Sequence, residues 1–270
     1  MTDDTSIKIV ENYNIDGKNK VIIQAFTGSG LVASIVGHHL IDKLGMEEKG
    51  YISSQLIPSV GIVRNGVVSR PVRVYENNTY LMVLSEVGIT REDLPEFIEA
   101  LFIWYNSLDP VSIVLVGGLP TGRPSDAEDL KYRVIASDQM TQKYLVDKGI
   151  RTMKQGAVYG SVALSLMEAK RYGIACFAIM SHCIATVPDY LAAKKVIEIF
   201  KIVLNENITL EPLLENAIEL REHLIRREKE KLDEDSDIEY EYEEDEEDFF
   251  QDIYDDDDDS DEDDEYSKFV

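Results

Sequence analysis

The chain has 270 residues and a formal net charge of −25, nearly all of it in one segment. Residues 233–270 hold 23 acidic side chains and one basic side chain, which gives −22, whereas residues 1–232 hold 29 acidic and 26 basic, which gives −3. Only two cysteines occur, Cys176 and Cys183, both in an apolar run, which excludes a disulfide framework and favours a reducing, cytoplasmic setting. No stretch approaches the roughly 18 apolar residues of a membrane span, so no membrane partner is expected.

Hydrophobic periodicity along residues 1–232 predicts short strands and longer helices, the pattern of a sheet layered with helices. The predicted strands are Ile7–Val10, Val21–Phe26, Ile62–Arg64, Val67–Tyr75, Tyr80–Ser85, Ser112–Val116, Arg133–Ala136 and Ala175–Ser181. The predicted helices are Leu31–Leu44, Leu94–Asn106, Gln139–Lys148, Ser161–Arg171, Tyr190–Leu204 and Leu210–Lys231. We therefore expect residues 1–232 to form a single α/β domain with a C-terminal helix.

Turn residues and strand composition indicate a mixed, mostly parallel sheet. Asn65-Gly66 lies between β-branched runs and predicts a hairpin, and Glu76-Asn77-Asn78 predicts a second one. The runs Val21–Phe26, Ser112–Val116 and Ala175–Ser181 are almost continuously apolar, as expected for central strands covered on both faces.

The last predicted helix carries a wide apolar stripe. Asp189 can cap the helix before it, and Thr209 with Glu211 and Pro212 can start the last one. Apolar residues then recur at spacings of three and four, which predicts a face packed on the sheet or on a second subunit. We expect a homo-oligomer with contacts at Leu213, Ala217, Leu220 and Leu224.

Three glycine turns are candidates for a ligand pocket. Gly28-Ser29-Gly30 follows an apolar strand, opens a helix and fits the G-x-G-x-x-A form of a dinucleotide loop. The ribose-binding carboxylate expected of such a loop is missing, because Glu47 and Glu48 precede the next predicted strand and do not end it. With Gly117, Gly118 and Gly156, this turn could form a pocket at the strand ends, and the alternative is that all are tight packing turns. No cofactor is predicted.

Catalytic and metal-ligating patterns are sparse. His38 and His39 are adjacent, so on a helix they face about 100° apart and cannot ligate one metal together. His182 beside Cys183 is more typical of packed core residues than of a nucleophile with its base. These observations predict no metal site and no enzymatic activity.

The acidic segment from Asp233 to Val270 cannot bury enough apolar surface to offset chain entropy, which predicts a disordered tail. Seven aromatic residues are set into it: Tyr240, Tyr242, Phe249, Phe250, Tyr254, Tyr266 and Phe269. Acidic sequences with interleaved aromatics are typical of segments that bind basic protein partners, and the alternative is a purely solubilising tail. Nucleic acid is not an expected partner, since the tail repels phosphate and the body has no net positive charge.

The order of segments resembles the proteasome assembly chaperone family in the form that its archaeal members take. The matching features are the strand and glycine turn at residues 21–44, Ile57-Pro58 with its hairpin, Val116-Gly117-Gly118, Gly156 to Gly160, Tyr172-Gly173-Ile174 and Pro188-Asp189-Tyr190. The resemblance covers roughly residues 15–220.

This resemblance implies a fold similar to the nucleoside phosphorylase type, homo-oligomeric assembly and binding to proteasome α-subunits or related protein assemblies without catalysis. Some relatives end in a hydrophobic residue, tyrosine and any residue, a tripeptide that inserts between α-subunits. Here the chain ends in Lys268-Phe269-Val270, with lysine at the hydrophobic position and Tyr266 upstream of the expected tyrosine. The candidate partner-binding residues in the tail are Tyr254, Tyr266, Lys268, Phe269 and Val270.

Two other functions stay open at the level of sequence. One is a phosphorylase-type enzyme that acts on a nucleoside-like ligand at the glycine turns. The other is an acidic chaperone for basic proteins, in which the tail alone provides the activity.

Overall fold

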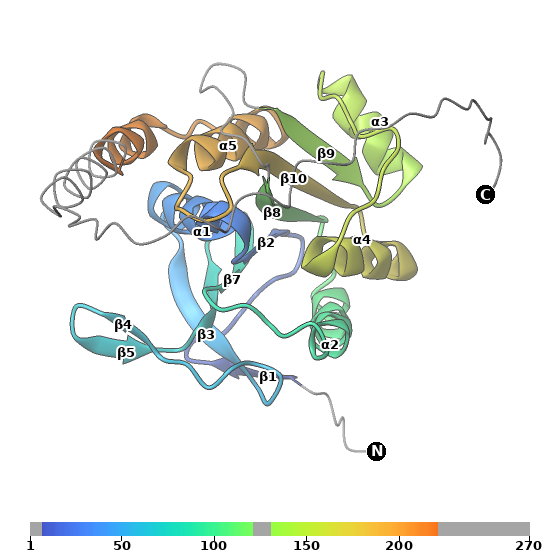
Figure 1. Cartoon of the computed structure of the whole chain (residues 1–270). Coiled ribbons are helices and arrows are strands. Elements are labelled where there is room, and N and C mark those ends of the chain that lie inside the picture. Colours follow the sequence, from blue (N-terminus) through green and yellow to red (C-terminus); the bar gives the residue numbers. More distant parts are fainter. Residues whose placement is uncertain (1–6, 121–130, 221–270) are drawn as a thin grey trace, which may run out of the picture. The chain divides into compact units, whose positions relative to one another are not determined.

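The structure of the chain is a computed structural model that describes residues 7–120 and 131–220 (Figure 1). Its strands are β1 (Ile7–Glu11), β2 (Val21–Phe26), β3 (Glu47–Ser54), β4 (Ile62–Arg64), β5 (Val67–Ser69), β6 (Val72–Glu76), β7 (Tyr80–Ser85), β8 (Ser112–Pro120), β9 (Tyr132–Ala136) and β10 (Cys176–Cys183). Its helices are the short 3-10 turn η1 (Ser29–Leu31), α1 (Val32–Lys43), α2 (Leu94–Ser107), α3 (Gln139–Asp147), α4 (Gly160–Tyr172) and α5 (Tyr190–Leu204). Residues 211–220 are also helical.

Eight strands form one mixed sheet in the order β1-β3-β6-β7-β2-β8-β10-β9. The parallel pairs, β7 with β2, β2 with β8 and β8 with β10, occupy its centre, and antiparallel pairs extend it on both sides. The three nearly continuous apolar runs become β2, β8 and β10, which are neighbours at the centre. The expected mixed α/β sheet is confirmed.

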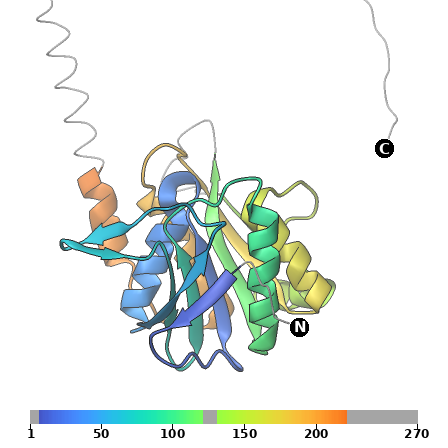
Figure 2. The same cartoon turned by 90° about the horizontal axis from the view of Figure 1, so that it is seen from below.

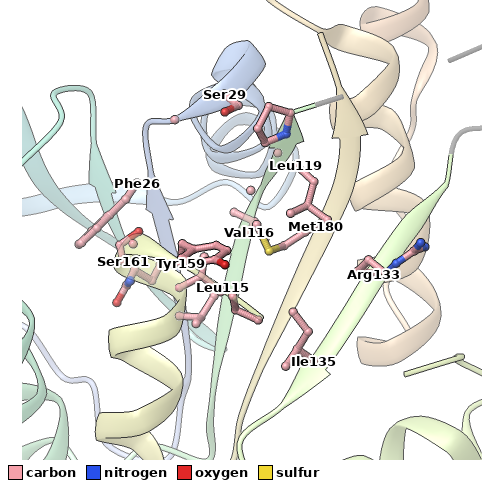
Figure 3. Close-up of a pocket in the computed structure, with 18 of the residues that line it drawn as sticks. Phe26, Ser29, Leu115, Val116, Leu119, Arg133, Ile135, Tyr159, Ser161 and Met180 are labelled. Atoms are coloured by element: carbon pink, nitrogen blue, oxygen red, sulfur yellow. The ribbon is translucent and has the colours of Figure 1, made fainter. Parts of the chain in front are cut away.

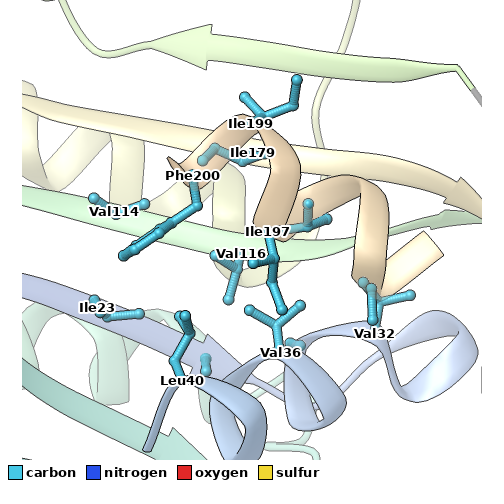
Figure 4. Close-up of a cluster of buried hydrophobic side chains, with 14 of the residues drawn as sticks. Ile23, Val32, Val36, Leu40, Val114, Val116, Ile179, Ile197, Ile199 and Phe200 are labelled. Atoms are coloured by element: carbon cyan, nitrogen blue, oxygen red, sulfur yellow. The ribbon is translucent and has the colours of Figure 1, made fainter. Parts of the chain in front are cut away.

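Helices cover both faces of the sheet and enclose a separate apolar core on each (Figure 2). On one face α1 and α5 pack against β2, β8 and β10, and Figure 4 shows Val36 of α1 and Ile197 of α5 meeting beside Val116. On the other face α2 packs against α4, with Phe97 and Phe102 fully buried. Two-sided cover is what makes the central strands apolar along their whole length.

Both predicted hairpins form. Asn65 and Gly66 adopt φ angles of 50° and 77° between β4 and β5, which is the left-handed pair that a type I′ turn requires. Between β6 and β7, the Asn77 side chain accepts hydrogen bonds from the backbone N–H groups of Thr79 and Tyr80.

One strand was not predicted and another was predicted too long. Glu47–Ser54 forms β3, although two glutamates and Gly50 weaken its strand signal, because it pairs with β1 on one side and β6 on the other. The predicted strand Val67–Tyr75 divides at Arg70-Pro71, since proline has no N–H to donate to a ladder.

The predicted cap of α5 forms, but one predicted oligomer contact does not lie on the surface. Asp189 accepts a hydrogen bond from Ala192 N at 2.9 Å and caps α5, as predicted. Leu213 is only 2% exposed and belongs to the core around α1 and α5, so it is not available to a second subunit. Ala217 and Leu220 are half-buried, and Leu224 lies outside the described residues.

The predicted domain end at residue 232 and the acidic tail also lie outside the described residues. Within residues 7–120 and 131–220, no helix combines the length and apolarity that crossing a membrane requires.

Candidate functional site

A cavity of about 480 Å³ lies where the carboxyl ends of β2 and β8 meet the amino end of α4 (Figure 3). The loop after β2 contributes Gly28 and Ser29, β8 contributes Gly117 and Gly118, and Tyr159–Val162 lines the side formed by α4. In open α/β sheets this end of the parallel strands is the usual place for a ligand. Four of the six glycine-turn residues named from the sequence, Gly28, Ser29, Gly117 and Gly118, line this cavity.

The other two residues of the predicted pocket have different positions. Gly30 is buried, and a Cβ there would stand 2.8 Å from the carbonyl oxygen of Ile184. Its own carbonyl accepts a hydrogen bond from Asp189 N at 2.8 Å, so Gly30 is a packing turn that joins η1 to the start of α5. Gly156 does not line the cavity, although its neighbour Ala157 does.

The adjacent glycines of β8 serve different ends. A Cβ on Gly118 would stand 2.5 Å from Ser29 O and 2.6 Å from Cys183 Sγ, so only glycine fits between β8 and the η1 turn. A Cβ on Gly117 would meet only Met180 Cε, at an ordinary 3.7 Å. Gly118 thus permits close packing, whereas the missing side chain of Gly117 leaves room in the cavity.

The cavity wall is mostly apolar, with polar groups at its rim. Figure 3 shows Phe26, Leu115 and Met180 around it, together with Val116, Leu119 and Ile135. The side chains of Ser29, Ser161 and Arg133 supply hydroxyl and guanidinium groups. A wall of this kind can hold an apolar group whose attached polar or anionic part points toward Arg133.

Gln24 is the buried polar residue of the cavity, and its side chain is already engaged. Its Nε2 donates to Ser165 Oγ at 2.9 Å, and Tyr105 OH donates to its Oε1 at 3.5 Å. Burial raises the pKa of Tyr105 well above its usual value, so the phenol stays protonated. This link ties β2 to α2 and α4 and is structural.

The cysteine and histidine near the cavity do not form a nucleophile with its base. Burial and the nearby Asp189 raise the pKa of Cys183 to about 11, so the thiol is protonated at neutral pH. His182 precedes it in β10, and side chains at successive strand positions point to opposite faces of the sheet. Burial and the charges of Arg133 and Lys131 lower the pKa of His182, which keeps the imidazole neutral.

The neighbouring histidines of α1 also bind separate partners. His38 Nε2 lies 3.1 Å from Glu86 Oε1, while His39 Nε2 lies 2.8 Å from the carbonyl oxygen of Thr209. Among the described residues no group of three or more histidine, cysteine or carboxylate side chains is arranged to hold a metal ion.

Glu86 is the centre of an ion cluster that joins the β4–β5 hairpin to the sheet. It pairs with Arg64 of β4 and with Arg73 of β6, whose Nη2 lies 2.5 Å from Glu86 Oε2. Burial would raise the pKa of Glu86, but hydrogen bonds and charges from Arg73, His38 and Arg64 lower it below its ordinary 4.5. The cluster holds the hairpin at a fixed place on the body.

The β4–β5 hairpin exposes valines that the sequence did not single out as functional. Val63, Val67 and Val68 are each more than two-thirds exposed, and Val63 pairs directly with Val68 across the two strands. A signal for them was present, because a two-residue turn between valine-rich strands predicts a ribbon too small to bury both faces. The tail candidates Tyr254, Tyr266, Lys268, Phe269 and Val270 lie outside the described residues.

Comparisons with known proteins find the same fold in archaeal proteins. A crystal structure of PbaA from Pyrococcus furiosus, described as an archaeal homolog of proteasome-assembly chaperone, has a TM-score of 0.76 and 24% identity, covering 86% of this chain and 94% of that one. PbaB from the same organism, described as an archaeal proteasome activator, has a TM-score of 0.71 and 20% identity, covering 83% and 99%. An uncharacterized protein of Methanocaldococcus jannaschii is 23% identical over 212 residues, which cover 78% of this chain and 87% of the relative.

A protein-family model matches most of the chain. The model of the PAC2 family matches residues 22–227, from the first central strand to beyond the last described helix. This match agrees with the resemblance inferred from the order of the segments. The chain belongs to the PAC2 family.

Proposed function

We propose that this protein is a non-catalytic assembly chaperone or scaffold that binds proteasome subunits or related protein assemblies. The observation that carries the proposal is the fold shared with PbaA and PbaB over more than four-fifths of the chain. Proteasome α-subunits are the proposed partners, and the cytoplasm is the proposed location.

The exposed valines of the β4–β5 hairpin support a protein-binding role. Clustered apolar side chains that project from a folded body are a common mark of a protein interface. Arg64 lies next to the hairpin turn and is paired with Glu86, so the valines are presented on a tethered element. Such a surface loses little conformational entropy when a partner covers it.

We further propose that the protein is a homo-oligomer, with contacts on the last helix. Leu214 and Ile218 are exposed there, beside the half-buried Ala217 and Leu220. In such an assembly each subunit would carry one acidic tail, and Tyr254 and Phe269 would act as weak contacts that add up over several tails.

The proposal is tested by mixing the purified protein with archaeal proteasome α-subunits and recording native mass spectra of the complexes. We expect defined complexes with α-subunits, which weaken when Val63 and Val68 are both changed to aspartate. The matched control is Ile103→Asp on α2, another exposed apolar position, which should leave the complexes intact. Absence of any complex at tens of micromolar, for the full chain with its tail, would refute the proposed partner.

A further inference from the structure

A second groove, of about 620 Å³, runs along the outer side of β9 and is strongly basic. Residues 151–155 lie beside residues 131–134 there. Met153 N donates a hydrogen bond to Val134 O at 2.8 Å. Among the described residues, the lining includes four cations and no carboxylate: Lys131, Arg133, Arg151 and Lys154.

These four cations have no acidic partner within the part of the chain that the structure describes. Arg133 donates to the backbone oxygen of Tyr132 at 2.9 Å, and no ion pair joins Lys131, Arg151 or Lys154 to a described carboxylate. Their positive field reaches His182, whose pKa is lowered by burial and by Arg133 and Lys131. Like charges around one groove, with no described carboxylate among them, favour a polyanionic ligand.

The basic groove adjoins the apolar cavity. Arg133 and Met153 line both, and Figure 3 shows Arg133 on the same strand as Ile135, which faces the cavity. Together they form one composite site, with an apolar half beside Gly117 and a basic half beside Lys154. A ligand that fills both halves must combine a bulky apolar group with several negative charges.

We infer that this composite site binds the acidic segment at residues 243–259 of a second copy of the chain. That segment holds twelve acidic residues and no basic ones, with Phe249 and Phe250 at its centre. The acidic residues complement the four cations, and a phenylalanine ring suits a cavity in the size range of ligand sites, roughly 300–1,000 Å³. Every copy of the chain carries this segment. An acidic peptide is therefore always present at the same concentration as the site.

The choice of a second copy as source rests on the proposed homo-oligomer, in which neighbouring tails reach a high effective concentration. Nucleic acid fits less well, because a phosphate backbone offers nothing to the apolar half and is repelled by tails of charge −22. A bound tail would block the composite site against other ligands. A partner that captures the tail would therefore also free the cavity.

The site is tested first with a fluorescein-labelled peptide of residues 243–259 and the full chain, followed by fluorescence anisotropy. We expect saturable binding that weakens about tenfold in the double variant Arg151→Glu with Lys154→Glu. The control is Lys18→Glu with Arg91→Glu, an equal charge change at exposed positions elsewhere, which should alter binding less than twofold. Gly117→Val in the protein and Phe249→Ser with Phe250→Ser in the peptide should each weaken binding severalfold.

The source is tested with carbodiimide, which joins amines to carboxylates in direct contact, on a mixture of ¹⁴N- and ¹⁵N-labelled full chains. We expect mixed-isotope links from Lys131 and Lys154 to residues 243–259, and few from Lys18. Links found only within one isotope would overturn the second copy as source, while peptide binding unaffected by the groove and Gly117 variants would overturn the site itself. Tighter binding of a single-stranded RNA of about 20 nucleotides, unaffected by Gly117→Val, would assign the groove to nucleic acid and overturn the proposal. Light scattering of the same samples shows separately whether the oligomer exists.

Discussion

Gly117 and Gly118 are neighbours in β8 but face opposite layers of the protein, so adding one methyl group should affect them differently. Gly118→Ala places a Cβ within 2.6 Å of both Ser29 O and Cys183 Sγ and should cost about 1–3 kcal/mol of unfolding free energy. Gly117→Ala meets only Met180 Cε at 3.7 Å and should change the unfolding free energy by less than about 0.5 kcal/mol. Urea unfolding followed by circular dichroism measures both. Equal losses would contradict the account of the cavity.

Glu86 should make stability sensitive to acid. Its pKa is lowered on folding, because Arg73, His38 and Arg64 outweigh the effect of burial, so its stabilising contribution is present above the ordinary 4.5. That contribution is lost as the pH falls through the lowered folded pKa. Glu86→Gln should therefore lower the unfolding free energy by about 3 kcal/mol at pH 7, because it leaves the buried Arg73 without its main charged partner.

The measurement is urea unfolding of wild type and Glu86→Gln from pH 7 to pH 3. The difference in unfolding free energy between wild type and Glu86→Gln should become smaller below pH 4.5. The exposed control Glu92→Gln should have the unfolding free energy of the wild type at every pH. A constant gap would show that Glu86 contributes by packing and not by charge.

At the scale of elements, substitutions on the two faces of the helix at residues 211–220 should affect folding and assembly separately. Leu213→Asp buries a charge in the core and should unfold the protein or lower its melting temperature by more than 10 °C, a loss of several kcal/mol. Ile218→Asp changes a residue that is 59% exposed and should leave the melting temperature within a few degrees while reducing the mass in solution. Multi-angle light scattering with thermal unfolding checks both. An unchanged mass for Ile218→Asp would remove this face from the proposed interface.

The elements that the sequence predicted well are those in which local pattern and tertiary environment agree. The bounds of β2, β4, β7 and α5 match their predicted ranges, since their apolar runs or caps are strong and uninterrupted. β3 was missed because its glutamates and Gly50 are poor strand formers, and its place depends on partners that come before and after it in the chain. The predicted oligomer contact at Leu213 failed for a similar reason. An apolar stripe on a helix does not reveal whether the sheet of the same chain or a second subunit covers it.

The site itself was predictable only in part. Glycine turns after apolar strands indicated a pocket at the strand ends, and Gly28, Ser29, Gly117 and Gly118 do line one. The basic groove was not foreseen, because its two segments are about twenty residues apart and each holds only two cations. Their proximity follows from the pairing of residues 151–153 with β9, which no local pattern encodes.

At the scale of the whole molecule, the acidic tail should contribute little to folding. Within the described residues, the apolar side chains of both cores lie before residue 214, and residues 233–270 add mainly a charge of −22. Deleting residues 233–270 should therefore shift the melting temperature by no more than about 5 °C, and upward if the charges repel one another. Differential scanning calorimetry at low and high salt checks this. A large loss of stability would show that folding of the body depends on the tail.

The parallel centre of the sheet also sets the order in which the protein can fold as it is synthesised. β6 and β7 are joined by a short hairpin and can pair early, but β8 receives its partner β10 only after a further 55 residues, from 121 to 175, have been made. At roughly 5–20 residues per second, the apolar edge of β8 would wait about 3–11 s on the ribosome without that partner. During this interval the nascent chain exposes an unpaired strand edge of the kind that aggregates.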